Sequence, residues 1–351
     1  MYRANAIVNP PNTSRHLGPS DYAMIGALVM NQCDGIDGVE DGYLTNPALC
    51  KPDLSSLSCA MPYANQSACL LPEQIDTMYT IWGTFVTQTD AGFPKGTFVF
   101  PGFMPGAEGS PQFLVTGVPF GPGPSWLQFQ VSDASRLRCP IPAIIYLTSC
   151  LQILNQTDPN DQLPALNQSE IEQLYKIGVE TNPGQTTAAD PNIEPFLKHG
   201  KLLTYVGLAD AGIPAGTTLH YREEVYKALG YPENLDDSFR TFTGAPAFFY
   251  LPEGVPLTLP LTTFRFVCCF AVPGMAHCAG GPGPNSFGGP WQRQDVLGGG
   301  AQSLTFDKQH DMLLAMIDWV ENGNAPDEII AVKYNKDKKT EGVAFTRPLC
   351  P

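Results

Sequence analysis

The sequence has 351 residues, a formal net charge of −14 and a pI of about 4.7. This acidity excludes a protein that binds nucleic acid or anionic membranes through its charge. No apolar stretch reaches the length of about 18 residues that a membrane span needs. The hydrophobic fraction of 43%, with 34 Gly and 34 Pro, predicts a loop-rich globular protein. The charge suits a protein that acts on neutral substrates, and a simpler interpretation is that it serves solubility alone.

Cysteines and glycosylation sequons indicate a secreted protein. Among ten cysteines, Cys33 with Cys50 and Cys59 with Cys69 form close pairs in polar, Pro-rich sequence, as disulfides on loops do. Four N-glycosylation sequons begin at Asn12, Asn65, Asn155 and Asn167. The first residues do not form a signal peptide, since they lack an apolar core. We therefore expect an extracellular protein whose natural N-terminus lies upstream of Met1.

The first half of the chain contains two predicted helices and a long irregular region. Residues 20–32 predict a helix with Ser20 as its N-cap. Residues 72–88 predict a second helix with Pro72 in its first turn. Residues 90–165 are rich in Gly and Pro, so short strands at most are expected there.

The pattern changes near residue 190. Residues 201–208 and 262–272 are short apolar runs typical of buried parallel strands, and residues 217–229 predict the helix between them. Residues 305–322 predict an amphipathic helix that ends at Gly323, and residues 329–334 a last strand. The apolar side of that helix is formed by Leu313, Leu314, Ile317 and Val320. Alternating strands and helices indicate an α/β layer, and we divide the chain near residue 190.

Asp210 and His277 each follow one of these buried strands. In open α/β sheets, functional groups gather at the carboxyl ends of strands. An Asp followed along the chain by a His matches the second and third members of an α/β-hydrolase triad. The His would take a proton from the nucleophile, and the Asp would orient the imidazole. The alternative is that both are ordinary polar loop residues.

The nucleophile of such a triad is not found in this sequence. No Gly-x-Ser-x-Gly motif is present. Ser20, Ser125 and Ser286 lie near glycines, but none stands between a buried strand and a helix, as the nucleophile elbow requires.

Residues 33–50 contain a second constellation, the acidic loop. Asp34, Asp37 and Asp41 lie close together among glycines. Several carboxylates in a short Gly-containing loop suit a hard cation with oxygen ligands, and Ca²⁺ is the best candidate. The spacing is not that of an EF-hand. The alternative is a solvated acidic turn.

These segments resemble the tannase and feruloyl esterase family. The resemblance rests on residues 33–42 with Cys50, on residues 201–210 with Ile213, and on residues 272–283. Residues 318–326 and 346–351 are similar to the family's C-terminal part. The resemblance implies the C-terminal part of an α/β-hydrolase fold over residues 191–351. It also implies a large, loop-rich, calcium-binding lid domain over residues 1–190.

The resemblance also assigns roles to residues. Asp210 and His277 match the acid and base of the family's Ser-His-Asp triad. The lid's Ca²⁺ would be bound by Asp34, Asp37 and Asp41 with the backbone oxygens of Val39 and Tyr43. Cys33–Cys50 and Cys59–Cys69 match lid disulfides. Cys278 matches a cysteine that bridges to one directly before the serine.

The sequence departs from the family at several positions. No cysteine is followed by serine, so Cys278 lacks its partner, and a missing N-terminal segment is expected to supply it together with the serine. Val206 stands where the family often has His. Residues 100–185 match poorly. No family role is assigned to Cys139, Cys150, Cys268 and Cys269.

The resemblance implies a serine carboxylic ester hydrolase. Its substrates would be phenolic acid esters, feruloyl or galloyl, as small molecules or linked to plant polysaccharide. The alternative is an inactive fragment or a non-enzymatic calcium-binding relative, because the serine is absent.

Overall fold

The computed structural model describes residues 3–62, 65, 68–108, 166–182, 188–232, 234–241, 270–289, 292 and 302–349. The chain forms two compact units. The first comprises Met1–Asp21, Ser55–Gly102 and Pro111–Ala189; the second comprises Tyr22–Leu54, Phe103–Ser110 and Asp190–Pro351. One boundary coincides with the division predicted near residue 190. Residues 22–54 and 103–110 nevertheless group with the C-terminal residues, and the assignment of residues 1–190 to a lid stays a prediction.

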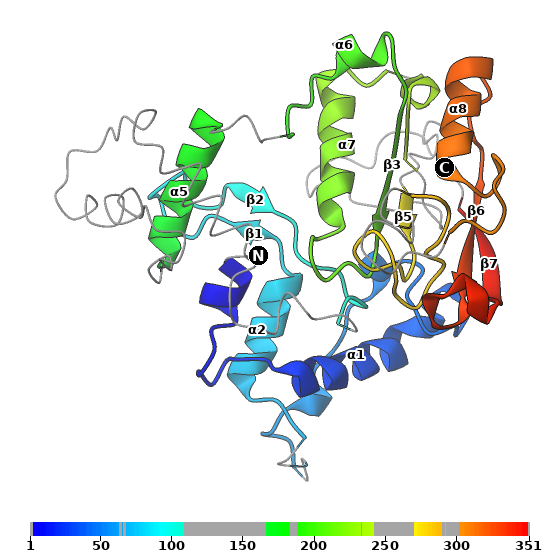
Figure 1. The fold of residues 1–351 in the computed structure, drawn as a ribbon. Coiled ribbons are helices and arrows are strands. Elements are labelled where there is room, and N and C mark those ends of the chain that lie inside the picture. The colour runs from blue at the N-terminus through cyan, green and yellow to red at the C-terminus, as the bar shows by residue number, and fades with distance from the viewer. Residues whose placement is uncertain are drawn as a thin grey trace, which may run out of the picture. The chain divides into compact units, whose positions relative to one another are not determined.

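The first unit combines helices with a short hairpin (Figure 1). Its elements are η1 (Ala4–Val8), α2 (Pro72–Trp82), β1 (Phe85–Val86), β2 (Phe98–Phe100) and α5 (Gln168–Thr181). The helix expected over residues 72–88 ends at Trp82, because the chain becomes extended at Gly83 and enters β1, which pairs antiparallel with β2. The sequence analysis did not predict α5. Its N-terminal signal was present, since Asn167 and Glu170 form a capping box.

A buried carboxylate ties α5 to the residues that follow β1. Glu172 is 1% exposed. It accepts hydrogen bonds from the amides of Gln88 and Thr89 at 2.6 and 3.0 Å and from the side chain of Gln168 at 2.5 Å. Both oxygens of the carboxylate therefore have hydrogen-bond partners within the unit, as a buried carboxylate requires.

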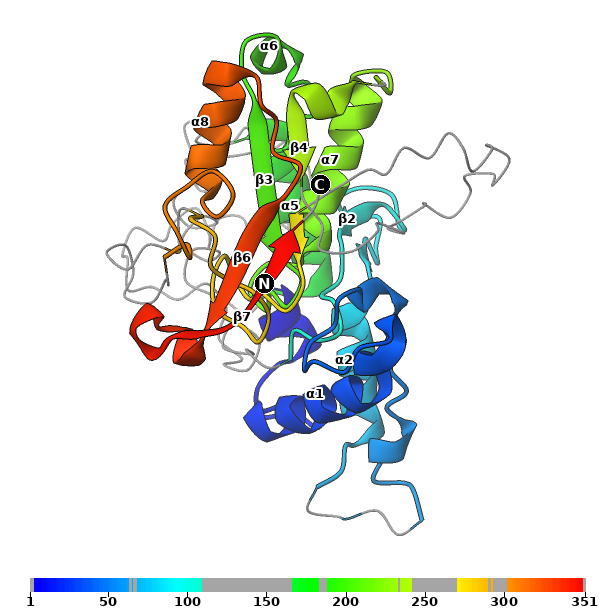
Figure 2. The ribbon, with the colours of Figure 1, turned by 90° about the vertical axis from the view of Figure 1, so that its right-hand side faces the viewer.

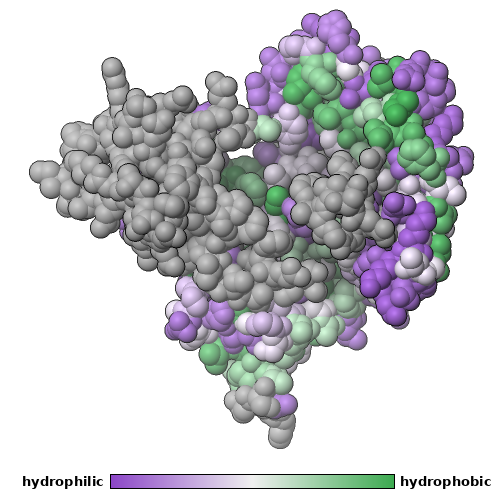
Figure 3. All heavy atoms as spheres, viewed as in Figure 1, coloured by the Kyte–Doolittle hydropathy of each residue, from purple (hydrophilic) through white to green (hydrophobic). Residues whose placement is uncertain are grey.

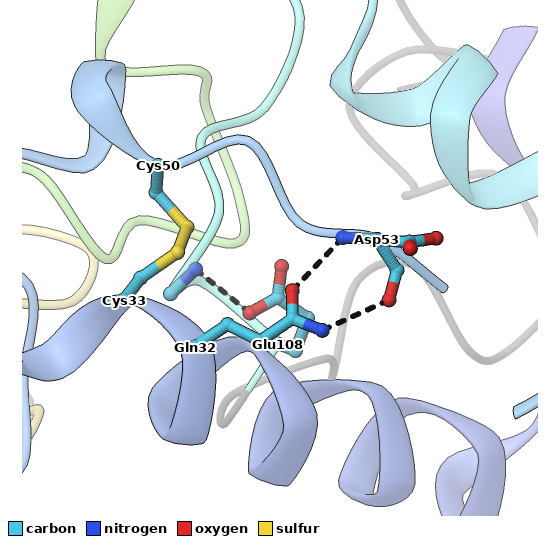
Figure 4. Close-up of a disulfide and its surroundings, with 6 residues drawn as sticks. Gln32, Cys33, Cys50, Asp53 and Glu108 are labelled. Atoms are coloured by element: carbon cyan, nitrogen blue, oxygen red, sulfur yellow. Dashed lines mark hydrogen bonds between the residues drawn. A yellow bond between two sulfur atoms is a disulfide. The ribbon is translucent and has the colours of Figure 1, made fainter. Parts of the chain in front are cut away.

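Helix α1 (Pro19–Cys33), which belongs to the second unit from Tyr22 onward, is fixed at its C-terminal end (Figure 4). Its last residue, Cys33, forms the disulfide with Cys50. Next to the disulfide, the Gln32 side chain exchanges two hydrogen bonds with the backbone of Asp53, at 2.9 and 3.0 Å. The helix begins one residue before the predicted Ser20, so Ser20 lies in its first turn.

A parallel sheet forms the frame of the second unit. Its strand β3 (Leu202–Gly207) pairs in parallel with β4 (Phe239–Thr241) and with β5 (Phe270–Val272). Helix α7 (Gly216–Ala228) follows β3, as predicted. Of the strand predicted over residues 262–272, the part before Phe270 lies outside the described residues. Figures 1 and 2 show α7 and α8 (Met312–Asn322) on opposite sides of β3.

Helix α8 corrects one expectation. It begins at Met312, because the Asp311 carboxylate caps the amides of Leu313 and Leu314. The buried side chains are Met312, Ala315 and Trp319, whereas three of the four residues on the expected apolar side are exposed: Leu313, Ile317 and Val320. Figure 3 shows hydrophobic surface where α8 lies in Figure 1. The side of the helix that carries Trp319 is the buried one. The Lys201 ammonium and the Arg240 guanidinium lie over the Trp319 ring, 5.4 and 5.7 Å from its centroid.

The chain ends in an antiparallel hairpin of β6 (Ile329–Tyr334) and β7 (Val343–Leu349). The strand over residues 329–334 was predicted, and its partner was not. The main core of the unit contains Leu203, Val272, Met275, Phe287, Trp319 and Ile329. The remaining short elements are η2 (Asp34–Asp37), η3 (Pro47–Leu49), η4 (Ser55–Leu57), α6 (Glu194–Leu197), η8 (Leu235–Asp237), η10 (Asn335–Asp337) and η11 (Lys339–Glu341).

Several features bear on the expected secretion. Both predicted disulfides, Cys33–Cys50 and Cys59–Cys69, are present. The sequon residues Asn12, Asn65 and Asn167 are exposed, and Asn155 lies outside the described residues. No helix in the described part of the chain is long and apolar enough to cross a bilayer.

Candidate active site

Asp210 lies just past the carboxyl end of β3. Residues 208 and 209 continue the strand's contacts, since the amide of Leu208 donates to Val272 O at 3.0 Å and that of Ala209 to Met275 O at 2.9 Å. The Asp210 side chain is 4% exposed. Its Oδ1 accepts hydrogen bonds from the amides of Gly212 and Ile213 at 2.7 and 2.9 Å. Backbone amides therefore fix one oxygen of the carboxylate, and Oδ2 is left to bind another group.

His277 lies in the turn that follows β5. The amide of Ala276 donates to Gly280 O at 3.0 Å, and Gly280 and Gly281 both adopt positive φ angles. Gly207 lets this turn approach β3, because a Cβ there would overlap the carbonyl oxygens of Met275 and Ala276. The His277 side chain remains 47% exposed.

The two side chains meet. His277 Nδ1 lies 2.8 Å from Asp210 Oδ2, so the Nδ1 proton is donated to the carboxylate. This hydrogen bond is the main reason that the pKa of His277 is raised, against the opposing effect of burial. The bond leaves Nε2 as the nitrogen that accepts a proton. The structure thus brings together the two residues predicted at the ends of these strands, and their catalytic roles stay a prediction.

Gln292, which the sequence analysis missed, holds the His277 turn in place. Its amide is fully buried. Its oxygen accepts from the amides of Phe287 and Gly289 at 2.7 and 3.1 Å, and its nitrogen donates to Cys278 O at 3.4 Å. No motif marks a lone Gln in a loop, so the only available signal was its position in a Gly-rich stretch after the His.

A polar cluster supports the other end of the same turn. Lys333 of β6 and Asn285 both donate to Gly281 O, and both bind the carboxylate of Asp337. The turn is thus anchored to the C-terminal hairpin. This link joins residues far apart in sequence, so spacing did not reveal it.

A cavity of about 270 Å³ lies beside the pair, within the second unit. It is bordered by Ala209 and Ala276, the residues directly before Asp210 and His277. Neither catalytic candidate lines it. Much of its wall is formed by small residues of α1, namely Ala23, Gly26 and Ala27. The cavity is therefore lined by the sequence neighbours of Asp210 and His277, although not by these two residues themselves.

Other candidates fit poorly as a nucleophile. The Ser286 side chain is 1% exposed and donates to Asn285 Oδ1 at 3.0 Å. Ser20 lies in α1, and Ser125 lies outside the described residues. Cys278 is a free cysteine whose pKa is raised by burial, which disfavours the reactive thiolate.

The carboxylates of the acidic loop bind groups of the chain itself, except that Oδ1 of Asp41 is buried without a hydrogen-bond partner. The Asp34 carboxylate accepts from the amides of Asp41 and Gly42, at 3.1 to 3.3 Å. Asp37 Oδ1 accepts from the Val39 amide at 2.9 Å. Asp41 pairs with Arg347 of β7. No three Asp, Glu, His or Cys side chains of the described residues are grouped to hold a metal ion. The donor types suit Ca²⁺, but as arranged they do not form its coordination shell.

Tyr43, the last predicted calcium ligand, belongs to the same contact between the acidic loop and β7. Its ring is 3% exposed and stacks on Phe345 at 6.3 Å. The Arg347 guanidinium lies 5.2 Å from the same ring. Burial is the main reason that the pKa of the Tyr43 hydroxyl is raised. The loop and the C-terminal strand are therefore joined by one ion pair and two ring contacts.

Comparison with known proteins gives the family to which this chain belongs. A family model described as "Tannase and feruloyl esterase" matches residues 3–351. The probable feruloyl esterase B-1 of Aspergillus flavus is 26% identical over 351 residues, which cover 98% of this chain and 52% of that protein. Feruloyl esterase C of Talaromyces stipitatus is 26% identical over 341 residues, covering 95% of this chain and 50% of that protein.

Solved structures show the same fold. The crystal structure of an esterase from Aspergillus oryzae has a TM-score of 0.72 at 25% identity, covering 99% of this chain and 55% of that chain. The tannin acyl hydrolase from Aspergillus niger has a TM-score of 0.59 at 19% identity and resembles this chain in fold alone. This chain spans about half the length of these relatives. Over that length, the chain belongs to the tannase and feruloyl esterase family.

Proposed function

We propose that this chain supplies the base and the orienting acid of a secreted carboxylic ester hydrolase. The observation that carries the proposal is the 2.8 Å hydrogen bond between His277 and the buried Asp210, at the ends of two paired parallel strands. Family membership supports the same reaction class. The two disulfides are in keeping with an extracellular location.

The chemistry assigned to the pair is acyl transfer. His277 Nε2 takes the proton of a serine hydroxyl as the serine attacks the ester carbonyl. Asp210 then stabilises the imidazolium, and the raised pKa of His277 reflects that stabilisation. His277 then gives the proton to the leaving alcohol. In the second step water attacks the acyl-serine, His277 takes a proton from that water and returns it to the serine, and the acid is released.

The serine would come from polypeptide outside this chain. The chain offers no suitable serine in its described residues, and it spans about half the length of its relatives. Cys278 adjoins His277 and is a free thiol, so a disulfide from it would hold a nucleophile-bearing segment close to the base. We assign this bridge to a cysteine next to the serine. The serine would then lie within reach of His277 Nε2.

The substrate class is phenolic acid esters, feruloyl or galloyl. The cavity beside the Asp–His pair supports this assignment, because about 270 Å³ bordered by small side chains can admit a flat ring. The wall contributed by α1 would set the ring's size limit. Gly26→Val would narrow the cavity without touching either catalytic candidate.

A chimera tests the proposal. The part of the Aspergillus flavus relative that has no counterpart here is joined to this chain, and hydrolysis of methyl ferulate and methyl gallate is measured. We expect hydrolysis that His277→Ala removes and that Gly26→Val weakens more for the bulkier ester. A folded chimera without ester hydrolysis would instead favour an inactive, calcium-binding relative.

Calcium binding at the acidic loop also remains a proposal. Asp34, Asp37 and Asp41, with the carbonyl oxygens of Val39 and Tyr43, are ligands of the type Ca²⁺ prefers. To bind the ion, the Asp34 carboxylate would have to leave the amides of Asp41 and Gly42. Binding would therefore compete with contacts that the chain already makes.

Isothermal titration measures this competition directly. Ca²⁺ is titrated into the chain and into Asp37→Ala, which leaves the Asp34 and Asp41 contacts intact. A site at the loop predicts binding by the unmodified chain and its loss in the variant. Equal heats of binding from both proteins would rule out a calcium site at the acidic loop.

A further inference from the structure

Strands β4 and β5 meet β3 in consecutive register. Leu202, Leu203 and Thr204 pair with Phe239, Arg240 and Thr241. The next three residues of β3, Tyr205 to Gly207, pair with Phe270 to Val272. Both pairings are parallel, and neither contains a register shift. Along β3, therefore, Phe270 takes the position directly after Thr241.

Hydrogen bonds place both strands on the same edge of β3. The amide of Leu202 donates to Ser238 O at 2.8 Å, beside β4, and that of Leu208 donates to Val272 O at 3.0 Å, in β5. Amides two residues apart in a strand point to the same edge, because the pleat repeats every two residues. Leu202 and Leu208 are separated by an even number of residues. The two strands thus lie end to end along one edge.

The faces of the sheet also continue across the break. Phe239 packs with Val225 of α7, and Ala271 packs with Ala215 directly before that helix. Arg240 stacks on Trp319 of α8, and Val272 belongs to the same α8 core. In a single strand of order 239, 240, 241, 270, 271, 272, alternate residues face α7 and α8. The observed packing follows that alternation.

We propose that β4 and β5 are two halves of one strand, the strand that positions His277, and that residues 242–269 are an insertion within it. The chain leaves the strand after Thr241 and re-enters it at Phe270 without altering register or face. Residues 238–241 then belong to the frame that places the base, although they precede His277 by more than thirty positions in the sequence. No described strand occupies the opposite edge of β3.

A matched pair of deletions tests the insertion. In the full chain, removing residues 242–269 joins Thr241 to Phe270 and keeps the phase of the strand. Removing residues 242–270 joins Thr241 to Ala271 and turns Ala271 and Val272 to the wrong faces. The two variants differ by one residue, so chain length and composition are controlled.

We expect the in-phase deletion to unfold cooperatively, with a midpoint within about 3 °C of the unmodified chain, since losing an insertion changes loop entropy little. The out-of-phase deletion should lower the midpoint by about 10 °C or fail to fold. The in-phase variant should also keep the raised pKa of His277, read by NMR. Equal behaviour of the two deletions, including failure of both to fold, would overturn the proposal.

A nicked protein gives a second measurement that does not depend on a deletion. A specific protease site replaces residues 250–256 in the full chain, and the protein is cut in its native state. Two halves of one strand, each held by β3, predict that the two pieces elute together and keep the unfolding midpoint. Separation of the pieces without denaturant would count against the inference.

Discussion

Two groups of carboxylates were predicted to be functional, and the fold treats them differently. Asp210 is fixed by the ends of parallel strands and turned toward His277, which gives it a partner across 67 residues of sequence. Asp34, Asp37 and Asp41 are turned to amides of their own loop and to Arg347. A strand end directs a side chain toward its neighbour strand, whereas a short loop can satisfy its carboxylates locally. The comparison separates a pair set by the sheet from a loop whose carboxylates bind the loop's own amides and one arginine of β7.

Removing the Cys33–Cys50 disulfide should have the largest effect on the acidic loop. The bond closes a separation of 17 residues, which corresponds to about 3 kcal/mol in the chain-entropy account. We expect Cys33→Ser with Cys50→Ser to lower the free energy of unfolding by that amount in urea titrations. Cys59→Ser with Cys69→Ser, across a separation of 10, is the control and should cost less. A larger loss of stability in Cys59→Ser with Cys69→Ser would show that loop-closure entropy does not dominate the contribution of these disulfides.

Gly207 of β3 and Gly42 of the acidic loop should differ in how much stability is lost when each is replaced by alanine. Gly207→Ala introduces a Cβ against the backbone of the His277 turn, and we expect a loss of about 2–3 kcal/mol with a displaced His277. In Gly42→Ala of the acidic loop, the new Cβ meets open space. The cost is then only that of a non-glycine residue at a φ of 86°, and we expect a loss of stability of about 1 kcal/mol. Thermal unfolding of the two variants measures both losses. Equal losses would mean that the strand ends are not tightly packed.

Arg347→Met should loosen the acidic loop while sparing the Asp–His pair. It removes the ion pair with Asp41 and the contact on Tyr43, worth about 1 kcal/mol together, but keeps an apolar stem. Amide exchange should quicken in residues 34–43 and remain unchanged in residues 202–210. Lys336→Met removes another basic side chain of the C-terminal hairpin region, one that pairs with Glu341, and serves as the matched control. Faster exchange at β3 would show that the two regions are coupled.

The smallest predicted effect is a pH dependence of stability. The pKa of His277 is raised in the folded state, so the pair's contribution is complete below the unfolded pKa of about 6.5 and is lost as pH rises through the folded pKa. The difference in melting temperature between the unmodified chain and Asp210→Asn should therefore be larger at pH 6 than at pH 9. A difference that grew with pH would reverse the assigned sign.

The sequence predicted those parts of the fold whose partners follow a local rule. An apolar run followed by Asp or His was enough to place Asp210 and His277, because parallel strands share a carboxyl edge. Gln292 and the Lys333 cluster were missed, since their contacts depend on long-range packing that spacing does not encode. The apolar side of α8 was misjudged because Trp319, with Lys201 and Arg240 on its ring, decides which side is buried.

The most direct test of the central claim is the titration of His277, followed by NMR in the unmodified chain and in Asp210→Asn. A base held by Asp210 predicts a raised pKa for His277 that falls in the variant, with a downfield Nδ1 proton that disappears. The signals of His310, which pairs with Asp307, should not respond to the substitution. An unchanged pKa of His277 in Asp210→Asn would contradict the assignment of this pair as base and orienting acid.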